Sequence, residues 1–110
     1  MAFTLEQVGE VLLVAVDGQL VVTNRQDFKQ QVIERIDAGA RKLVIDFAHA
    51  AYVDSSGLGV LVSLAKRVRE AGGQLRLSGL NEDLRVLFEL TRLDSLFQIV
   101  GSRADAIASF

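Results

Sequence analysis

The chain has 110 residues, of which 50% are hydrophobic and 24% are charged, and its formal net charge is −2. This length fits one domain, placed at residues 1–110, and the negative charge argues against a nucleic-acid-binding surface, which needs a basic patch. The absence of cysteine excludes disulfides and thiolate metal sites. The sequence shows neither a signal peptide nor a membrane-spanning run, so we expect a cytoplasmic protein without membrane insertion.

The first half of the chain is predicted to contain a hairpin, a helix and a buried strand. Gly9-Glu10 is the expected hairpin turn, and Gly39 is placed to end the helix. Thr23 or Asn24 can cap the start of that helix. The predicted elements are strands over residues 3–7 and 11–17, a helix over residues 25–38, and a strand over residues 43–47.

The second half continues with alternating helices and strands. Gly72-Gly73 closes the first of these helices, and Asn81 can cap the next one. The strand between them alternates apolar and polar residues, which predicts one wetter face. The predicted elements are a helix over residues 56–71, a strand over residues 74–78, a helix ending at Leu90, a strand over residues 96–100 and a helix over residues 103–110. The order β-β-α-β-α-β-α-β-α predicts an α/β fold with a mixed sheet of four to five strands and about four helices.

The sequence lacks the residue groups of a small enzyme. His49 is the only histidine, and no nucleophile-elbow motif surrounds the nearby Ser55, although contact between the two is geometrically open. Asp46, His49 and Asp54 have no known metal-ligand spacing, and the glycines after Ser56 match a dinucleotide-binding motif incompletely. We therefore predict no catalytic residue, no cofactor and no bound metal.

The informative stretch is Asp54-Ser55-Ser56-Gly57-Leu58-Gly59, at the start of the helix over residues 56–71. One of the three polar residues is explained by helix capping, but capping accounts for neither the other two nor the glycines. Small residues would leave the helix start bare, so that another protein could approach closely. A helix start also tolerates an added phosphoryl group, because its free amides and dipole favour an anion.

This six-residue motif resembles that of the STAS domain in anti-sigma factor antagonists. The resemblance covers almost the whole chain and includes the preceding strand at residues 43–47, the Gly72-Gly73-Gln74-Leu75 segment and the segment at residues 87–93. It implies that Ser55 is phosphorylated and that the partner is a serine kinase of the histidine-kinase-like ATPase superfamily that also acts as an anti-sigma factor. The unphosphorylated antagonist would bind this kinase and free a sigma factor, and a metal-dependent serine phosphatase would restore that form.

The turn after the second strand departs from the family pattern. Many members carry a Gly-Glu-Leu-Asp-like turn, whereas here Gln19 and Val21 replace the two acids in Gly18-Gln19-Leu20-Val21-Val22. Val21 and Val22 either pack on the sheet, which is the preferred interpretation, or form an apolar contact with the partner. The partner-binding surface is predicted to contain Asp54, Ser55, Ser56, Gly57, Leu58, Gly59, Gln19 and Val21.

The sequence is also compatible with a second function. A STAS subunit without a switch could serve as a scaffold in a stressosome-like particle or a transporter-associated assembly. In that case Ser55 would be retained as a helix cap and not as a phosphorylation site.

Overall fold

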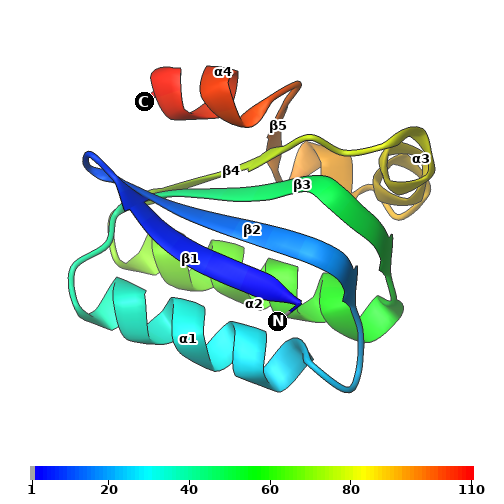
Figure 1. Cartoon of the computed structure of the whole chain (residues 1–110), viewed down its shortest axis with the longest axis horizontal. Helices are drawn as coiled ribbons and strands as arrows, with labels where there is room; N and C mark the ends of the chain where they lie inside the picture. The colour runs from blue at the N-terminus through cyan, green and yellow to red at the C-terminus, as the bar shows by residue number, and fades with distance from the viewer. Residues whose placement is uncertain (1) are drawn as a thin grey trace.

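The computed structural model describes residues 2–110 and contains one mixed sheet with the strand order β1-β2-β3-β4-β5 (Figure 1). β1 is antiparallel to β2, and every other neighbouring pair is parallel. The predicted order of strands and helices is confirmed, with an additional 3₁₀ turn at Leu93–Ser95. The strands are β1 (Phe3–Val8), β2 (Val11–Leu20), β3 (Lys42–Val53), β4 (Gln74–Ser78) and β5 (Gln98–Val100). The helices are α1 (Arg25–Asp37), α2 (Ser55–Glu70), α3 (Glu82–Leu90) and α4 (Arg103–Ala108).

The helices lie on both faces of the sheet. Figure 1 shows α1 and α2 side by side beneath one face, α4 above the other face and α3 beyond the end of β4. The main core lies between the sheet and the α1–α2 pair, because the apolar stripes of both helices face β1 to β4. Its largest fully buried side chains include Phe28, Phe47, Phe88, Leu61 and Leu64.

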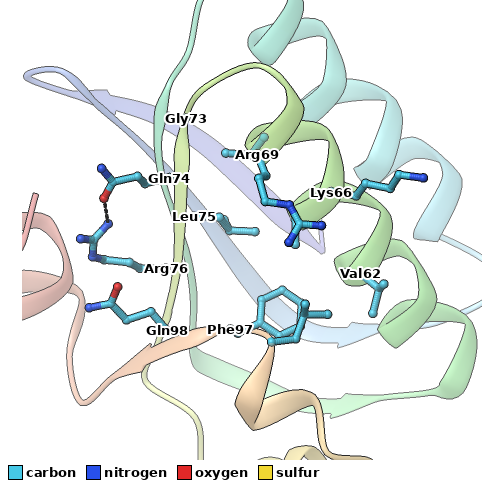
Figure 2. A pocket seen from close by; sticks show the side chains of 12 residues that line it. Val62, Lys66, Arg69, Gly73, Gln74, Leu75, Arg76, Phe97 and Gln98 are labelled. Carbon is cyan, nitrogen blue, oxygen red and sulfur yellow. Dashed lines mark hydrogen bonds between the residues drawn. The ribbon is translucent and has the colours of Figure 1, made fainter.

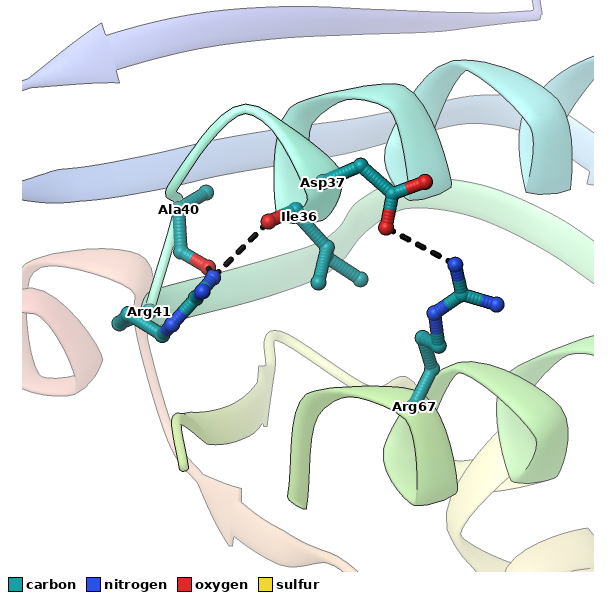
Figure 3. A network of polar contacts seen from close by, with 5 residues as sticks. All are labelled: Ile36, Asp37, Ala40, Arg41 and Arg67. Atoms are coloured by element: carbon teal, nitrogen blue, oxygen red, sulfur yellow. Dashed lines mark hydrogen bonds and ion pairs between the residues drawn. The ribbon is translucent and has the colours of Figure 1, made fainter. Parts of the chain in front are cut away.

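Polar contacts fix the ends of α1 and α2 next to each other (Figure 3). Arg67 of α2 donates a 2.8 Å hydrogen bond to the carboxylate of Asp37 at the end of α1. Arg41 binds the carbonyl oxygens of Ile36 and Ala40, both at 2.8 Å, where the chain leaves α1 for β3. These contacts join the end of α1 to α2 and to the segment that leads into β3.

β2 and β3 are longer than predicted. The sequence pattern ended them at Asp17 and Phe47, whereas the structure continues them to Leu20 and Val53. Their pairing shifts register after Ala15 and again after Gly18, whose φ is +88°. Each shift breaks the period-two alternation on which strand prediction depends, so residues 48–53 form strand where a loop was expected.

The predicted wet face of β4 is limited to Gln74, and the prediction is wrong for the rest of that face. Arg76 and Ser78 are buried because α4 packs over them. The Arg76 guanidinium lies 3.9 Å from the centre of the Phe110 ring and donates to the carbonyl oxygen of Ser109 at 3.3 Å. β4 is therefore covered on both faces, like the central part of β3.

The predicted cap of α3 is confirmed, whereas that of α1 takes a different form. The side chain of Asn81 accepts a hydrogen bond from the amide of Leu84 at 2.8 Å, as expected for the cap of α3. Asn24 occupies the cap position of α1 but makes no capping bond, because its side chain binds the preceding loop.

Within residues 2–110 no helix has the length and apolar character needed to cross a membrane.

Candidate functional site

The candidate site lies where β2 and β3 end and α2 begins. Leu20 and Val53 are paired at the ends of these two parallel strands. The amide of Asp54 donates to the carbonyl oxygen of Leu20 at 3.2 Å, and α2 starts at the next residue, Ser55. The carboxyl ends of parallel strands meet at one edge of a sheet, where ligands and partners of α/β folds commonly bind.

Asp54 is the cap of α2 and also binds a second loop. Its Oδ1 accepts hydrogen bonds from the Ser56 hydroxyl at 2.6 Å and from the Gly57 amide at 2.8 Å. Its Oδ2 accepts from the amide of Val22, 32 residues earlier in the chain, at 3.1 Å. The Ser56 hydroxyl, followed by the Gly57 and Val22 amides, holds the pKa of this carboxyl below its ordinary value. The side chain of Asp54 is therefore an ionised link between the start of α2 and the β2–α1 loop.

The two serines after Asp54 lie in different environments. Ser56 is half-buried, and its hydroxyl is bound to Asp54. Ser55 is exposed, and within the described residues its hydroxyl makes no hydrogen bond to another protein group. Of the two hydroxyls, only that of Ser55 is free to enter the active site of another protein.

The two glycines of the motif have different roles. A Cβ atom on Gly57 would lie 2.5 Å from the carbonyl oxygen of Leu20 and 2.9 Å from Cγ1 of Val53, so this glycine allows α2 to pack closely on the strand ends. The expectation that Gly57 leaves the helix start bare is therefore wrong. Gly59 meets that expectation, since it is exposed and a Cβ atom added to it would have nothing within 4 Å. Leu58 between them is buried in the core.

The segment Gly18 to Val22 is not one continuous turn, because β2 runs through Leu20. Gln19 is exposed, and its carbonyl oxygen accepts a hydrogen bond from the Asn24 side chain at 2.8 Å. Val21 is half-buried, and its amide donates to the same side chain at 2.9 Å. Val22 is 62% exposed, so the interpretation that it packs on the sheet is wrong.

Tyr52 is an exposed aromatic residue that the sequence interpretation did not select. It is 55% exposed and lies opposite Gln19 in the β2–β3 pairing. Its position depends on the extension of β3 beyond Phe47, which the sequence pattern did not reveal. We call the exposed residues around the helix start the α2-start surface, and they are Gln19, Val22, Tyr52, Ser55 and Gly59. Ser55 and Gly59 share one face of α2, since they are four residues apart.

The described residues form neither a catalytic pair of Ser55 with His49 nor a metal site. His49 lies on β3 opposite Asp17, and four residues of strand, about 13 Å, separate it from the end of β3. It makes no hydrogen bond to Ser55 within residues 2–110. Over the same residues, no three His, Asp or Glu side chains are grouped so that they could hold a metal ion.

Comparison with known proteins gives one consistent family. A protein-family model described as the STAS domain matches residues 2–106. The chain is 34% identical over 86 residues to the anti-sigma-B factor antagonist of Bacillus subtilis, a match that covers 78% of each protein. It is 29% identical over 110 residues to BtrV of Bordetella bronchiseptica, provisionally named an anti-sigma factor antagonist, with 100% of this chain and 95% of BtrV covered.

Solved structures show the same fold. A provisionally assigned anti-sigma factor antagonist from Thermotoga maritima superposes with a TM-score of 0.91 at 26% identity, covering 96% of this chain and 92% of that one. The phosphorylated form of SpoIIAA from Bacillus superposes with a TM-score of 0.79 at 22% identity, covering 97% of each chain. At 22% identity, the likeness to SpoIIAA shows a shared fold and no more.

Proposed function

The chain belongs to the STAS domain family, and we propose that it is an anti-sigma factor antagonist that is switched by phosphorylation of Ser55. In this proposal the unphosphorylated α2-start surface binds a serine kinase of the histidine-kinase-like ATPase superfamily that doubles as an anti-sigma factor. Binding frees a sigma factor or another target, and a metal-dependent serine phosphatase reverses the modification. The antagonist itself performs no catalysis in this cycle. The whole cycle would take place in the cytoplasm.

The observation that carries this proposal is the difference between Ser55 and Ser56. A kinase must bring the hydroxyl oxygen of its substrate into line with the γ-phosphoryl group of ATP. The hydroxyl of Ser55 is exposed and has no protein partner in the described residues, whereas that of Ser56 is bound to Asp54 at 2.6 Å. Phosphorylation of Ser56 would require its hydroxyl to leave Asp54 first, which makes Ser55 the favoured acceptor.

The charges at the start of α2 explain how the modification would act as a switch. A phosphoserine carries a charge of about −1.5 to −2, and the positive end of the α2 dipole accommodates an anion. The fold is therefore expected to survive phosphorylation. The neighbouring Asp54 stays ionised because the pKa of its carboxyl is lowered. Two adjacent anions on a surface that also presents Val22 and Tyr52 would oppose an apolar contact with the kinase.

The first test uses the serine kinase encoded nearest to the gene of this protein, with ATP and mass spectrometry of the intact protein and its peptides. We expect one phosphoryl group on Ser55, its loss in Ser55→Ala, and its retention in Ser56→Ala. Modification of Ser56 alone would exclude Ser55 as the acceptor. No modification by a kinase that is otherwise active would exclude the assignment and favour the scaffold alternative.

The second test separates charge from size. Ser55→Asp adds a carboxylate, whereas Ser55→Asn adds a neutral side chain of nearly the same shape. We expect Ser55→Asp to fold normally and to bind the kinase at least tenfold more weakly than Ser55→Asn, measured by titration calorimetry. Equal affinity of the two variants would show that charge at this position is not the switch.

A further inference from the structure

A groove of about 380 Å³ lies between α2, β4 and the segment that leads into β5 (Figure 2). It exists because β5 has only three residues at the edge of the sheet, while α2 packs over β4 and leaves the space beside β5 open. The volume is within the range of about 300–1,000 Å³ that is usual for small-molecule sites. Its far wall is the backbone of β4, and the side chains of Gln74 and Arg76 point away from it in Figure 2.

The floor of the groove is apolar. Val62 from α2 and Leu75 from β4 line it as half-buried side chains, and Phe97 closes the bottom as a buried ring. Leu96 lies beside Phe97 and is exposed. An apolar molecule bound to this floor would remove apolar surface of both the protein and the molecule from water. This burial is favourable in proportion to the area covered.

The rim of the groove carries positive charge from α2. Lys66 and Arg69 line it three residues apart, and no acidic residue is among the lining residues. In Figure 2 the Arg69 side chain extends over the groove, while Lys66 lies at its outer edge. Within residues 2–110 no carboxylate forms an ion pair with Arg69, and Lys66 approaches only the exposed Glu70, at 4.0 Å.

Cations near the end of a helix are common, because they interact favourably with the negative end of its dipole. That effect accounts for the sign of the charge on Lys66 and Arg69, but it does not account for an apolar hollow beneath them. An arginine without an ion-pair partner beside an apolar floor matches a ligand with an anionic head and an apolar body.

We propose that this groove binds a free single-chain anionic amphiphile, with its apolar chain on Val62, Leu75 and Phe97 and its carboxylate or phosphate at Arg69, assisted by Lys66. The site is independent of the α2-start surface. Arg69 lies 14 residues after Ser55 on the same helix, about 21 Å along its axis. The proposal therefore stands or fails separately from phosphorylation of Ser55.

The test is titration calorimetry of the full chain with decanoate and decyl phosphate below their micelle concentrations, together with amide chemical shifts recorded by NMR. We expect binding of one ligand per chain, with shifts centred on Val62, Leu75 and Phe97. Decanol lacks the anion and acetate lacks the chain, so each should bind at least tenfold more weakly than decanoate. Decanol binding as tightly as decanoate, or shifts centred elsewhere, would overturn the proposal.

Variants test the two halves of the site separately. Arg69→Gln should weaken decanoate binding about tenfold, and Ala65→Phe should fill the groove and abolish binding. Arg35→Gln, an exposed arginine on α1 outside the groove, is the matched control and should bind decanoate normally. Circular dichroism melting checks that each variant is folded. Unchanged affinity in folded Arg69→Gln would overturn the assigned role of Arg69.

A membrane surface is the other source of the same chemistry. Vesicles of mixed neutral and anionic phospholipid separate the two cases in a sedimentation assay. The proposal expects no sedimentation of the chain with these vesicles, because the groove takes one free chain. Sedimentation that depends on Arg69, without binding of free decanoate, would replace the proposed ligand by a lipid surface.

Discussion

The two carboxylate oxygens of Asp54 bind segments that are far apart in the sequence. Oδ1 holds the first turn of α2 through Ser56 and Gly57, and Oδ2 holds the β2–α1 loop through the amide of Val22. The side chain of Asp54 therefore helps to fix the exposed Val22 relative to Ser55, in addition to the pairing of β2 with β3. A change at Asp54 is expected to affect both the stability of the fold and the shape of the α2-start surface.

The stability contributed by Asp54 should depend on pH. The pKa of this carboxyl is lowered in the folded state, so its ionised form stabilises the protein above the unfolded value of about 4. This contribution is lost as the pH falls through the lowered folded pKa. We expect Asp54→Asn to unfold at lower urea concentration than wild type at pH 7, and the difference to shrink progressively below about pH 4.

Asn81→Ala is the control for this measurement, because it removes an uncharged cap. Asn81 accepts a hydrogen bond from the Leu84 amide and donates one to the carbonyl oxygen of Ala50. Removal of the Asn81 side chain should lower the free energy of unfolding by about 1 kcal/mol both at pH 7 and below about pH 4. A pH-independent effect of Asp54→Asn as well would show that the geometry of Asp54, and not its charge, provides the stabilisation.

Local sequence predicts a cap at this position but not what the cap binds. The motif showed that one of Asp54, Ser55 and Ser56 should cap α2, and the structure identifies Asp54. The bond from Val22 joins residues 32 apart in the chain, and it exists only once β2 and β3 are paired. The different exposure of Ser55 and Ser56 follows from the same tertiary arrangement, so composition and spacing could not separate the two serines.

At the scale of the elements, α2 carries two glycines with opposite expected effects on stability. Gly57→Ala would place a methyl group 2.5 Å from the carbonyl oxygen of Leu20, which forces the start of α2 away from the strand ends. We expect a loss of about 2 kcal/mol. Gly59→Ala meets nothing within 4 Å and should gain about 0.5–1 kcal/mol from higher helix propensity. Urea unfolding of this matched pair measures both effects.

Kinase affinity is a second measurement for Gly59→Ala. If the kinase approaches the backbone of α2 at Gly59, the methyl group of Gly59→Ala should weaken its binding while the fold becomes more stable. Unchanged kinase affinity in the stabilised variant would place Gly59 outside the contact. The outcome would then restrict the α2-start surface to Gln19, Val22, Tyr52 and Ser55.

Helices were predicted more accurately than strands, and the reason is physical. The apolar stripes of α1, α2 and α3 face one core, so their periodicity is regular and their bounds agree with prediction within one or two residues. β2 and β3 contain register shifts after Ala15 and Gly18, which break alternation without ending the pairing. Tyr52 was missed for this reason, since it lies on the part of β3 beyond those shifts.

At the scale of the whole molecule, the two faces of the sheet are covered unequally. α1 and α2 cover one face with an extensive core, whereas over the other face the short α4 packs on Val11, Leu13 and Val44 through Ala106. This small apolar contact is supplemented by an ion pair whose carboxylate is buried. Asp46 is 1% exposed and accepts hydrogen bonds from Ser78 at 2.7 Å and from Arg103 at 2.8 and 3.2 Å.

The ion pair between Asp46 and Arg103 is therefore expected to hold α4 on the sheet. Arg103→Met keeps most of the length of the side chain but leaves the Asp46 carboxylate buried without its cation. We expect a loss of roughly 3 kcal/mol, at the lower end of the range for breaking a buried pair, because the Arg103 side chain is itself 42% exposed. Urea unfolding measures this loss.

Arg67→Met breaks the exposed pair with Asp37 and is the matched control, with an expected change of at most about 1 kcal/mol. Hydrogen exchange then locates the effect of Arg103→Met. Amides of α4 should lose protection before those of α1 and α2, because α4 depends on the ion pair while the main core does not. Equal stability of the two variants, with α4 still protected, would mean that the apolar contacts around Ala106 and the contacts of Arg76 with Ser109 and Phe110 suffice to hold α4. The ion pair would then have little part in stability, although it joins residues that are 57 positions apart.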